Sequence, residues 1–141
     1  MPGRDETLIA LSLPCAPSAS AAVRAELSHH EELGWVLGDV MLVASELVNN
    51  AVLHSGGLPH HELEVCACRH AGRLTVSVRD PGISGQSAGP RAATDEQSGG
   101  WGLHIVEALS ERWGEEREIG DGYRVWADIS LAHGQQPSAS L

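Results

Sequence analysis

Residues 36–54 read VLGDVMLVASELVNNAVLH and carry the strongest helical pattern in the chain. Apolar residues recur there at steps of three and four, at Val36, Val40, Val43, Leu47 and Ala51. This spacing places them on one face of an α-helix. The following Ser55-Gly56-Gly57 ends the pattern. We therefore predict a helix over Val36–His54 whose apolar face packs on a core.

Two polar residues lie at the edge of that apolar face. At ~100° per residue, Glu46 and Asn50 are ~40° apart on one side of the helix, and His54 continues the row. A carboxylate and a carboxamide in this position would line the wall of a cleft. The alternative is an ordinary polar rim, which Ser45 and Asn49, predicted further round toward solvent, would fit.

Asp80 follows a predicted strand, Leu74–Arg79, in which apolar and polar residues alternate as in a half-buried strand. By the same alternation Asp80 falls on the apolar face, which we expect helices to cover. A buried carboxylate needs a donor, because leaving it unpaired is costly, and the amino group of a purine would satisfy it. Pro81-Gly82 would let a flat ring approach the backbone. The alternative is a turn aspartate, common before Pro-Gly.

The segment Ser98-Gly99-Gly100-Trp101-Gly102-Leu103 precedes a helix predicted over Leu103–Arg112. Glycines before a helix free backbone amides to point at an anion, and the helix dipole adds attraction. Residues 81–99 before it contain mainly Gly, Pro, Ser, Ala and Gln. A long loop of this kind inside a compact domain is typical of a functional lid or of a disordered segment, and we expect this one to order on nucleotide.

The remaining patterns predict a two-layer α+β sandwich, with a mostly antiparallel mixed sheet and helices on one face. A first helix is expected from Ser18 to about Glu32, with an apolar stripe of Ala22, Leu27 and Leu33 that Gly34 ends. The expected strands are Thr7–Leu13, Glu62–Arg69, Leu74–Arg79, about Trp113–Ile119 and about Tyr123–Leu131. With 141 residues the chain suits one domain, residues 1–134, followed by a polar tail, residues 135–141.

The overall charge limits the partners. The formal net charge is −10, and all nine basic residues are arginine. A surface this acidic repels a phosphate backbone and suits a basic protein partner, so we expect no direct nucleic-acid binding. A chain without lysine cannot have a P-loop, whose lysine reaches the phosphates. With no apolar run near ~20 residues and no signal-peptide pattern, we expect no membrane span and a cytoplasmic location.

Three cysteines, Cys15, Cys66 and Cys68, do not suggest a disulfide framework. Cys66, Cys68 and His70 alternate along one predicted strand and so share a face. Their spacing matches none of the usual zinc patterns, and one flat strand face cannot close a tetrahedron. We interpret them as small side chains on a half-exposed sheet face.

Together the segments resemble the Bergerat nucleotide fold of the histidine-kinase-like (GHKL) ATPases, the superfamily of gyrase, Hsp90 and sensor kinases. Residues 46–51 (ELVNNA) look like the N box, Asp80-Pro81-Gly82 like the first glycine box, and Gly100-Trp101-Gly102-Leu103 like the second. The resemblance covers nearly the whole chain. The short length and the stretches Ser45–His54 and Gly100–Gly114 are most similar to stand-alone actinobacterial anti-sigma-factor serine kinases.

The resemblance implies ATP and Mg²⁺ as cofactors and assigns roles residue by residue. Asn50 matches the asparagine that coordinates Mg²⁺, and Glu46 matches the general base acting on the acceptor hydroxyl. Asp80 matches the adenine-reading aspartate, with Gly82 beside it. Gly100 and Gly102 match the phosphate-loop glycines, and Leu103 follows them at the helix start beneath the phosphates. The role of His54, at a position often histidine in this subgroup, is left open.

The sequence departs from the family pattern in three places. The second glycine of the D-x-G-x-G pattern is displaced by one, to Gly85. Trp101 occupies the middle of the second glycine box, where small or basic residues are commoner. Residues 122–126 (GYRVW) stand where relatives often carry a lysine-threonine pair that touches phosphate, and we predict Arg124 as the substitute.

The leading functional hypothesis, by resemblance, is a partner-switching regulator. It would sequester a sigma factor and act as a serine/threonine kinase, phosphorylating an antagonist (anti-anti-sigma) protein with Mg-ATP. The alternative is an ATP-dependent interaction switch without significant phosphotransfer. A structural protein with a fossil site ranks lower, because Glu46, Asn50 and Asp80 all remain. A histidine-kinase fragment also ranks lower, because His29 and His30 lie on one short helix, which cannot form the dimerisation bundle that carries the phosphoacceptor histidine. The sequence leaves open whether the chain forms a homodimer.

Overall fold

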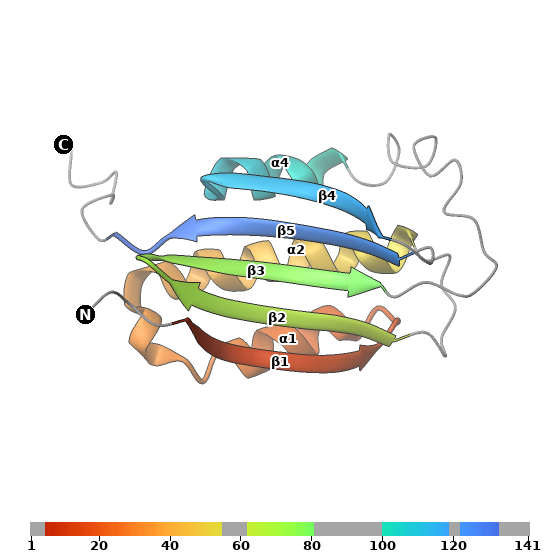
Figure 1. The fold of residues 1–141 in the computed structure, drawn as a ribbon. Helices are drawn as coiled ribbons and strands as arrows, with labels where there is room; N and C mark the ends of the chain where they lie inside the picture. The colour runs from red at the N-terminus through yellow and green to blue at the C-terminus, as the bar shows by residue number, and fades with distance from the viewer. Residues whose placement is uncertain (1–4, 55–61, 81–99, 119–121, 133–141) are drawn as a thin grey trace.

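The computed structural model describes residues 5–54, 62–80, 100–118 and 122–132. The elements in chain order are β1 (Glu6–Pro14), α1 (Ala19–Leu27), the 3-10 helix η1 (Glu31–Val36), α2 (Leu37–His54), β2 (Glu62–His70), β3 (Arg73–Asp80), α4 (Gly100–Leu109), β4 (Arg112–Glu118) and β5 (Gly122–Ser130). Figure 1 shows the strands in one layer with the helices behind it. The predicted lid, residues 81–99, and the predicted tail lie outside the described residues.

The five strands form one sheet in the order β1-β2-β3-β5-β4, and every neighbouring pair is antiparallel. Strands β3 and β5 are central partners and pair along their whole length, from Arg73 with Ser130 to Asp80 with Tyr123. The predicted fold class, a two-layer α+β sandwich with helices on one face, is confirmed.

The core lies between the sheet and the helices. Leu74, Val76 and Val78 of β3 are fully buried, as their alternation predicts. Helix α2 packs against β3 and β5 and lies between α1 and α4. Its residues Val43 and Leu47 are also fully buried, and burial of such side chains contributes roughly 1.5–3 kcal/mol each. This apolar interface fixes α2 on the sheet, and with it the polar residues along the edge of the helix.

The open face of the sheet holds a polar cluster centred on Asp128 of β5. Its Oδ1 accepts a hydrogen bond from Thr75 Oγ1 (2.6 Å), and its Oδ2 accepts one from Arg112 Nη2 (2.7 Å). Burial alone would raise the pKa of Asp128, but these two donors outweigh it, so the pKa lies below its usual value. The ionised carboxylate thus links β3, β4 and β5.

The first helix differs from its prediction. Instead of one helix to about Glu32, α1 ends at Leu27 and a separate 3-10 helix begins at Glu31. Gly34 has φ 59° and ψ −128°, a conformation essentially reserved for glycine, and there the chain turns into α2. The predicted stripe also changes, because Ala22 is exposed while Leu27 and Val23, one turn earlier, are fully buried.

Helix α4 begins and ends three residues before its prediction, at Gly100 and Leu109. Gly102 is therefore within the first turn, and Arg112 begins β4 instead of ending the helix. Helix α4 packs on α2 and, more lightly, on β4. The second glycine box is thus a helix start and not a turn before one.

By length and hydropathy alone, the segment Glu31–Leu53 could cross a membrane, which the sequence analysis does not predict. In the structure this segment is η1 and the central helix of the fold. Half of its most apolar window is buried inside the protein, where α2 faces the sheet. We therefore interpret its hydropathy as that of a core helix.

Candidate functional site

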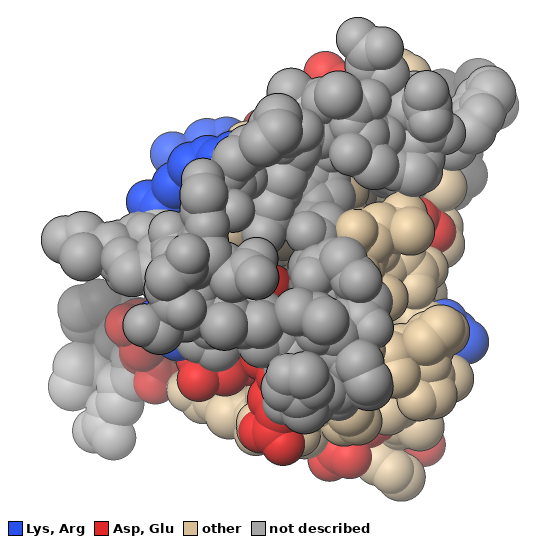
Figure 2. Space-filling view, turned by 90° about the vertical axis from the view of Figure 1, so that its right-hand side faces the viewer, with Lys and Arg blue, Asp and Glu red and all other residues tan. Residues whose placement is uncertain are grey.

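Four of the predicted segments meet at one end of the sandwich. Helix α2 ends there, β3 ends there, and β5 and α4 begin there, all at the right-hand side of Figure 1. In the view of this end, acidic side chains gather along the lower edge, and basic side chains gather at the upper left, the side of the open sheet face (Figure 2). The predicted site residues within the described ranges can be located one by one.

Asn50 lies near the end of α2 and is 5% exposed. The sequence predicts Asn50 at the edge of the apolar face of the helix, but the structure buries its side chain more deeply than that position implies. Its Nδ2 donates a hydrogen bond to the Tyr123 hydroxyl over 3.4 Å. Its Oδ1 is also buried, and no donor within the described ranges reaches that oxygen. An unsatisfied buried carboxamide oxygen costs free energy, and a cation would satisfy it.

Asp80 ends β3 on the helix-covered face, as the alternation predicts, and is 2% exposed. In the β3–β5 register it stands directly opposite Tyr123. A carboxylate at this depth is retained only where donors compensate for its lost hydration. Its place at a strand end, facing the helix layer, suits it to accept a hydrogen bond from a purine amino group.

Glu46 is half-buried and lies one turn before Asn50 on α2, about 6 Å along the helix axis. No described residue forms an ion pair with its carboxylate. Its neighbour Ser45 contradicts the prediction that it faces solvent, because it is 4% exposed and accepts a hydrogen bond from Arg24 Nη1 of α1 at 3.0 Å. Asn49 is exposed, as predicted. The buried side of α2 thus includes Ser45 and Asn50, and Glu46 remains accessible.

The two glycine segments are only partly within the described ranges. Gly82 lies outside them, so its predicted place beside the adenine stays a prediction. Gly100 and Gly102 form the first turn of α4, and Leu103 after them is half-buried. The free amides of such a turn, together with the helix dipole, can attract phosphate. This helix start lies at the same end of the fold as the C-terminal end of α2, the helix that carries Asn50 (Figure 1).

Arg124 is not brought together with the other predicted residues. It lies on β5 next to Tyr123 in sequence, so its side chain is on the opposite, open face of the sheet. There its Nη1 is 3.4 Å from Glu116 Oε1 of β4. The prediction that Arg124 replaces a phosphate-binding residue is not supported by this placement.

Tyr123 is the residue that the sequence analysis missed. It is 4% exposed, contacts Asn50 and faces Asp80 across the strand pair. A signal was present, since Tyr123, Val125, Ala127 and Ile129 alternate along β5. That alternation places Tyr123 on the apolar face and Arg124 on the other. The family pattern drew attention to the basic residue instead.

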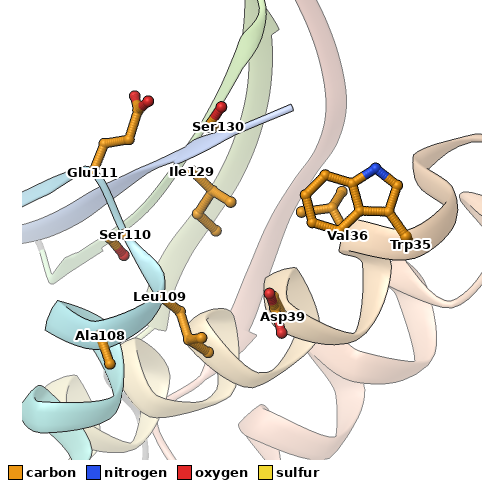
Figure 3. A pocket seen from close by; sticks show the side chains of 9 residues that line it. All are labelled: Trp35, Val36, Asp39, Ala108, Leu109, Ser110, Glu111, Ile129 and Ser130. Atoms are coloured by element: carbon orange, nitrogen blue, oxygen red, sulfur yellow. The ribbon is translucent and has the colours of Figure 1, made fainter. Parts of the chain in front are cut away.

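The structure also contains a cavity of about 300 Å³ at the other end of α2, between η1, α2, α4 and β5. Trp35 and Asp39 lie on one side of it and Leu109 and Glu111 on the other (Figure 3). Asp39 precedes Asn50 by about 16 Å along the helix. Two carboxylates, those of Asp39 and Glu111, line this cavity, and their negative charge would repel a bound triphosphate. It is separate from the Asn50–Asp80 site.

Cys66 and Cys68 are half-buried on the open face of β2, as interpreted from the sequence. Burial raises the pKa of the Cys66 thiol, which keeps it protonated and poorly reactive. Within the described parts of the chain, no three His, Cys, Asp or Glu side chains gather as a metal site.

The fold and the site define a class of protein: an α+β nucleotide-binding domain with a buried asparagine on its central helix and a buried aspartate at a strand end. Residues 14–127 match the family model of the histidine kinase-like ATPase domain, and the chain belongs to this family. The resemblance noted in the sequence is thereby confirmed, and membership implies that the domain binds ATP. No curated protein gives a significant sequence match.

Solved structures share the fold, among them the following two. One contains the RsbU and RsbW domains of Rv1364c from Mycobacterium tuberculosis, with a TM-score of 0.63 and 24% identity. The match covers 92% of this chain and 33% of that one, so the chain spans about a third of that protein. The other is the SiaB–SiaC complex from Pseudomonas aeruginosa, with a TM-score of 0.64 and 16% identity, covering 87% of this chain and 89% of that one.

Proposed function

We propose that this protein is an Mg-ATP-dependent serine/threonine protein kinase of the anti-sigma-factor type. It phosphorylates an antagonist protein and sequesters a sigma factor. The observation that carries the proposal is the arrangement on α2, where an accessible carboxylate, Glu46, lies one turn from a buried carboxamide, Asn50. Phosphoryl transfer uses a group that orients or deprotonates the acceptor and a metal held by protein ligands near it, and Glu46 and Asn50 can take these two roles.

The described residues fit the two cofactors. Asn50 Oδ1 is a buried oxygen that no described donor reaches, the kind of ligand that Mg²⁺ takes. Asp80 is a buried carboxylate that can accept from the adenine amino group. The free amides of Gly100 and Gly102, in the first turn of α4, can donate hydrogen bonds to the phosphates. When bound, Mg²⁺ would offset the negative charge of the transferred phosphoryl group.

Glu46 supplies the base. Its carboxylate accepts the proton of the acceptor hydroxyl as that oxygen bonds to the γ-phosphorus. The bond from the γ-phosphorus to the β,γ-bridging oxygen then breaks, and ADP leaves with the electron pair. Because Glu46 is not fully buried and forms no ion pair within the described residues, a hydroxyl on a second protein can reach it.

Two further observations support a protein as the acceptor. One structure with a similar fold was solved as a complex with a second protein, SiaB with SiaC, and another contains an RsbW domain together with an RsbU domain. The net charge of −10 suits a partner with a basic surface.

A second function is favoured by the position of Arg124. Its side chain lies on the open face, so this arginine does not join Asn50 and Asp80 to contact phosphate. A site that binds ATP with little charge to stabilise the transferred group would act as an ATP-dependent interaction switch.

The experiment that separates the two is Glu46→Gln, with Glu107→Gln as a matched control. Glu107 is an exposed carboxylate on α4 outside the proposed site. Both variants should bind ATP like the wild type. Glu46→Gln should lose roughly 10²–10⁴-fold in phosphotransfer to candidate antagonist proteins from the same genome, because a carboxamide cannot accept the proton. A Glu46→Gln variant as active as the wild type would remove Glu46 as the base, and a wild type that binds Mg-ATP but phosphorylates none of the candidates would favour the switch.

A further inference from the structure

Tyr123 is next to both buried polar residues of the proposed nucleotide site, Asn50 and Asp80. It stands opposite Asp80 in the β3–β5 register, and its hydroxyl accepts a hydrogen bond from Asn50 Nδ2 over 3.4 Å. With 4% of its surface exposed, it is part of the buried layer beneath α2. Tyr123 thus contacts the side chain of Asn50 directly through its hydroxyl.

The carboxamide of asparagine has a donor end and an acceptor end of nearly the same shape. Only the oxygen can bind a cation, and half a turn about the last side-chain bond exchanges oxygen and nitrogen. A hydroxyl that accepts from Nδ2 holds the nitrogen on its own side. The oxygen then lies on the other side, where Oδ1 of Asn50 is buried and out of reach of the described donors.

We propose that Tyr123 is a positioning residue that sets the carboxamide of Asn50 so that Oδ1 can ligate the Mg²⁺ of bound Mg-ATP. This inference rests on the proposed function, because it takes Asn50 as the metal ligand. The competing explanation is a structural bond that only joins α2 to β5. That bond would contribute to the stability of the fold but would not change how ATP binding depends on metal.

The test is Tyr123→Phe, which removes only the hydroxyl. ATP affinity is measured by calorimetry with Mg²⁺ and with EDTA, and the ratio of the two affinities measures how much Mg²⁺ strengthens ATP binding. Loss of a residue that orients a metal ligand typically lowers metal affinity by 10–100-fold, so the ratio should fall about tenfold. The affinity in EDTA should not change. Thr75→Val is the matched control, because it removes a hydroxyl on the open face of the neighbouring strand and should leave the ratio unchanged.

A double-mutant cycle shows whether Tyr123 acts through Asn50. In an Asn50→Ala background, Tyr123→Phe should have no further effect on the affinity ratio, since no carboxamide remains to be oriented. Equal losses from Tyr123→Phe with Mg²⁺ and with EDTA, or an equal additional loss in the Asn50→Ala background, would assign the bond a structural role and overturn the inference.

A second measurement needs no substitution at Tyr123. The chain has a single tyrosine, so labelling with 3-fluorotyrosine gives one ¹⁹F resonance from this position. Adding Mg²⁺ to the ATP complex should shift that resonance in the wild type and not in Asn50→Ala. A wild type that binds no ATP would refute the proposed function itself. A wild type with metal-dependent ATP binding but an unmoved resonance would overturn the role of Tyr123 alone.

Discussion

Replacing Asp80 by asparagine changes one buried group while its shape is kept. The wild-type carboxylate is 2% exposed and can accept a charge-assisted hydrogen bond from the adenine amino group. A carboxamide offers a neutral acceptor, and one of its two ends is a donor that opposes the amino group. The binding free energy of ATP should therefore be about 1–3 kcal/mol less favourable in Asp80→Asn than in the wild type, which corresponds to an affinity about 5–150-fold lower.

Calorimetry with two nucleotides separates this effect from damage to the fold. ITP carries a carbonyl where ATP carries the amino group. The wild type should prefer ATP to ITP, and Asp80→Asn should reduce that preference, because its amide nitrogen can donate to the carbonyl. Without nucleotide, urea unfolding should show a stability within about 1 kcal/mol of the wild type, since a buried charge is removed and not created.

Two results would refute the reasoning about Asp80. If the variant binds ATP as tightly as the wild type, Asp80 does not contact the nucleotide. If ATP and ITP affinities fall by the same factor, Asp80 supports the shape of the site and does not read the base.

Three further predictions concern the frame around the site. Gly34→Ala should lower the free energy of unfolding by about 1–3 kcal/mol, because Gly34 has a positive φ that alanine adopts only with strain. Gly38→Ala should raise the free energy of unfolding by up to about 1 kcal/mol, because Gly38 lies on α2 with open space around it. Equal stabilities of the two variants in urea unfolding would contradict the strain at Gly34. Because the pKa of Asp128 is lowered in the folded protein, its ionised carboxylate stabilises the fold at pH values above the usual pKa of aspartate, and this contribution is lost as the pH falls through the lowered pKa. The free energy of unfolding of Asp128→Asn should therefore change less between about pH 7 and about pH 3 than that of the wild type. Arg124→Ala should leave ATP affinity within about twofold, because the guanidinium pairs with Glu116 on the open face; a tenfold loss by calorimetry would show that it reaches the nucleotide.

The features that could be predicted from the sequence are those that follow from periodicity. Alternation in Leu74–Arg79 gives the two faces of β3, and extending it by one residue places Asp80 under the helices. The steps of three and four in α2 give its buried face. Both patterns are repeated enough that no long-range information is needed.

The features that could not be predicted depend on what an element packs against. Ser45 is buried because α1 covers that side of α2 and Arg24 donates to its hydroxyl, and the pattern of α2 alone contains neither fact. Gly34 is a helix-ending residue in sequence, but its turn into α2 follows from a φ value that sequence does not specify. The family pattern favours Arg124 as a phosphate contact, although the alternation in β5 places Tyr123 on the site face and Arg124 on the other.

The position of Glu46 and Asn50 on one helix has a consequence for regulation by a partner. Their backbones are joined by one rigid helical turn, and α2 is fixed on the sheet by the fully buried Val43 and Leu47. A protein that contacts Glu46 from the accessible side of α2 therefore cannot shift it without also shifting Asn50, which Tyr123 ties to β5. Contact by the acceptor and binding of Mg-ATP act on the same rigid body, so each should change the affinity for the other, and by the same factor. Calorimetry of partner binding with and without Mg-ATP, in the wild type and in Tyr123→Phe, measures that factor directly. If the proposed coupling runs through α2, the factor should be smaller in the variant.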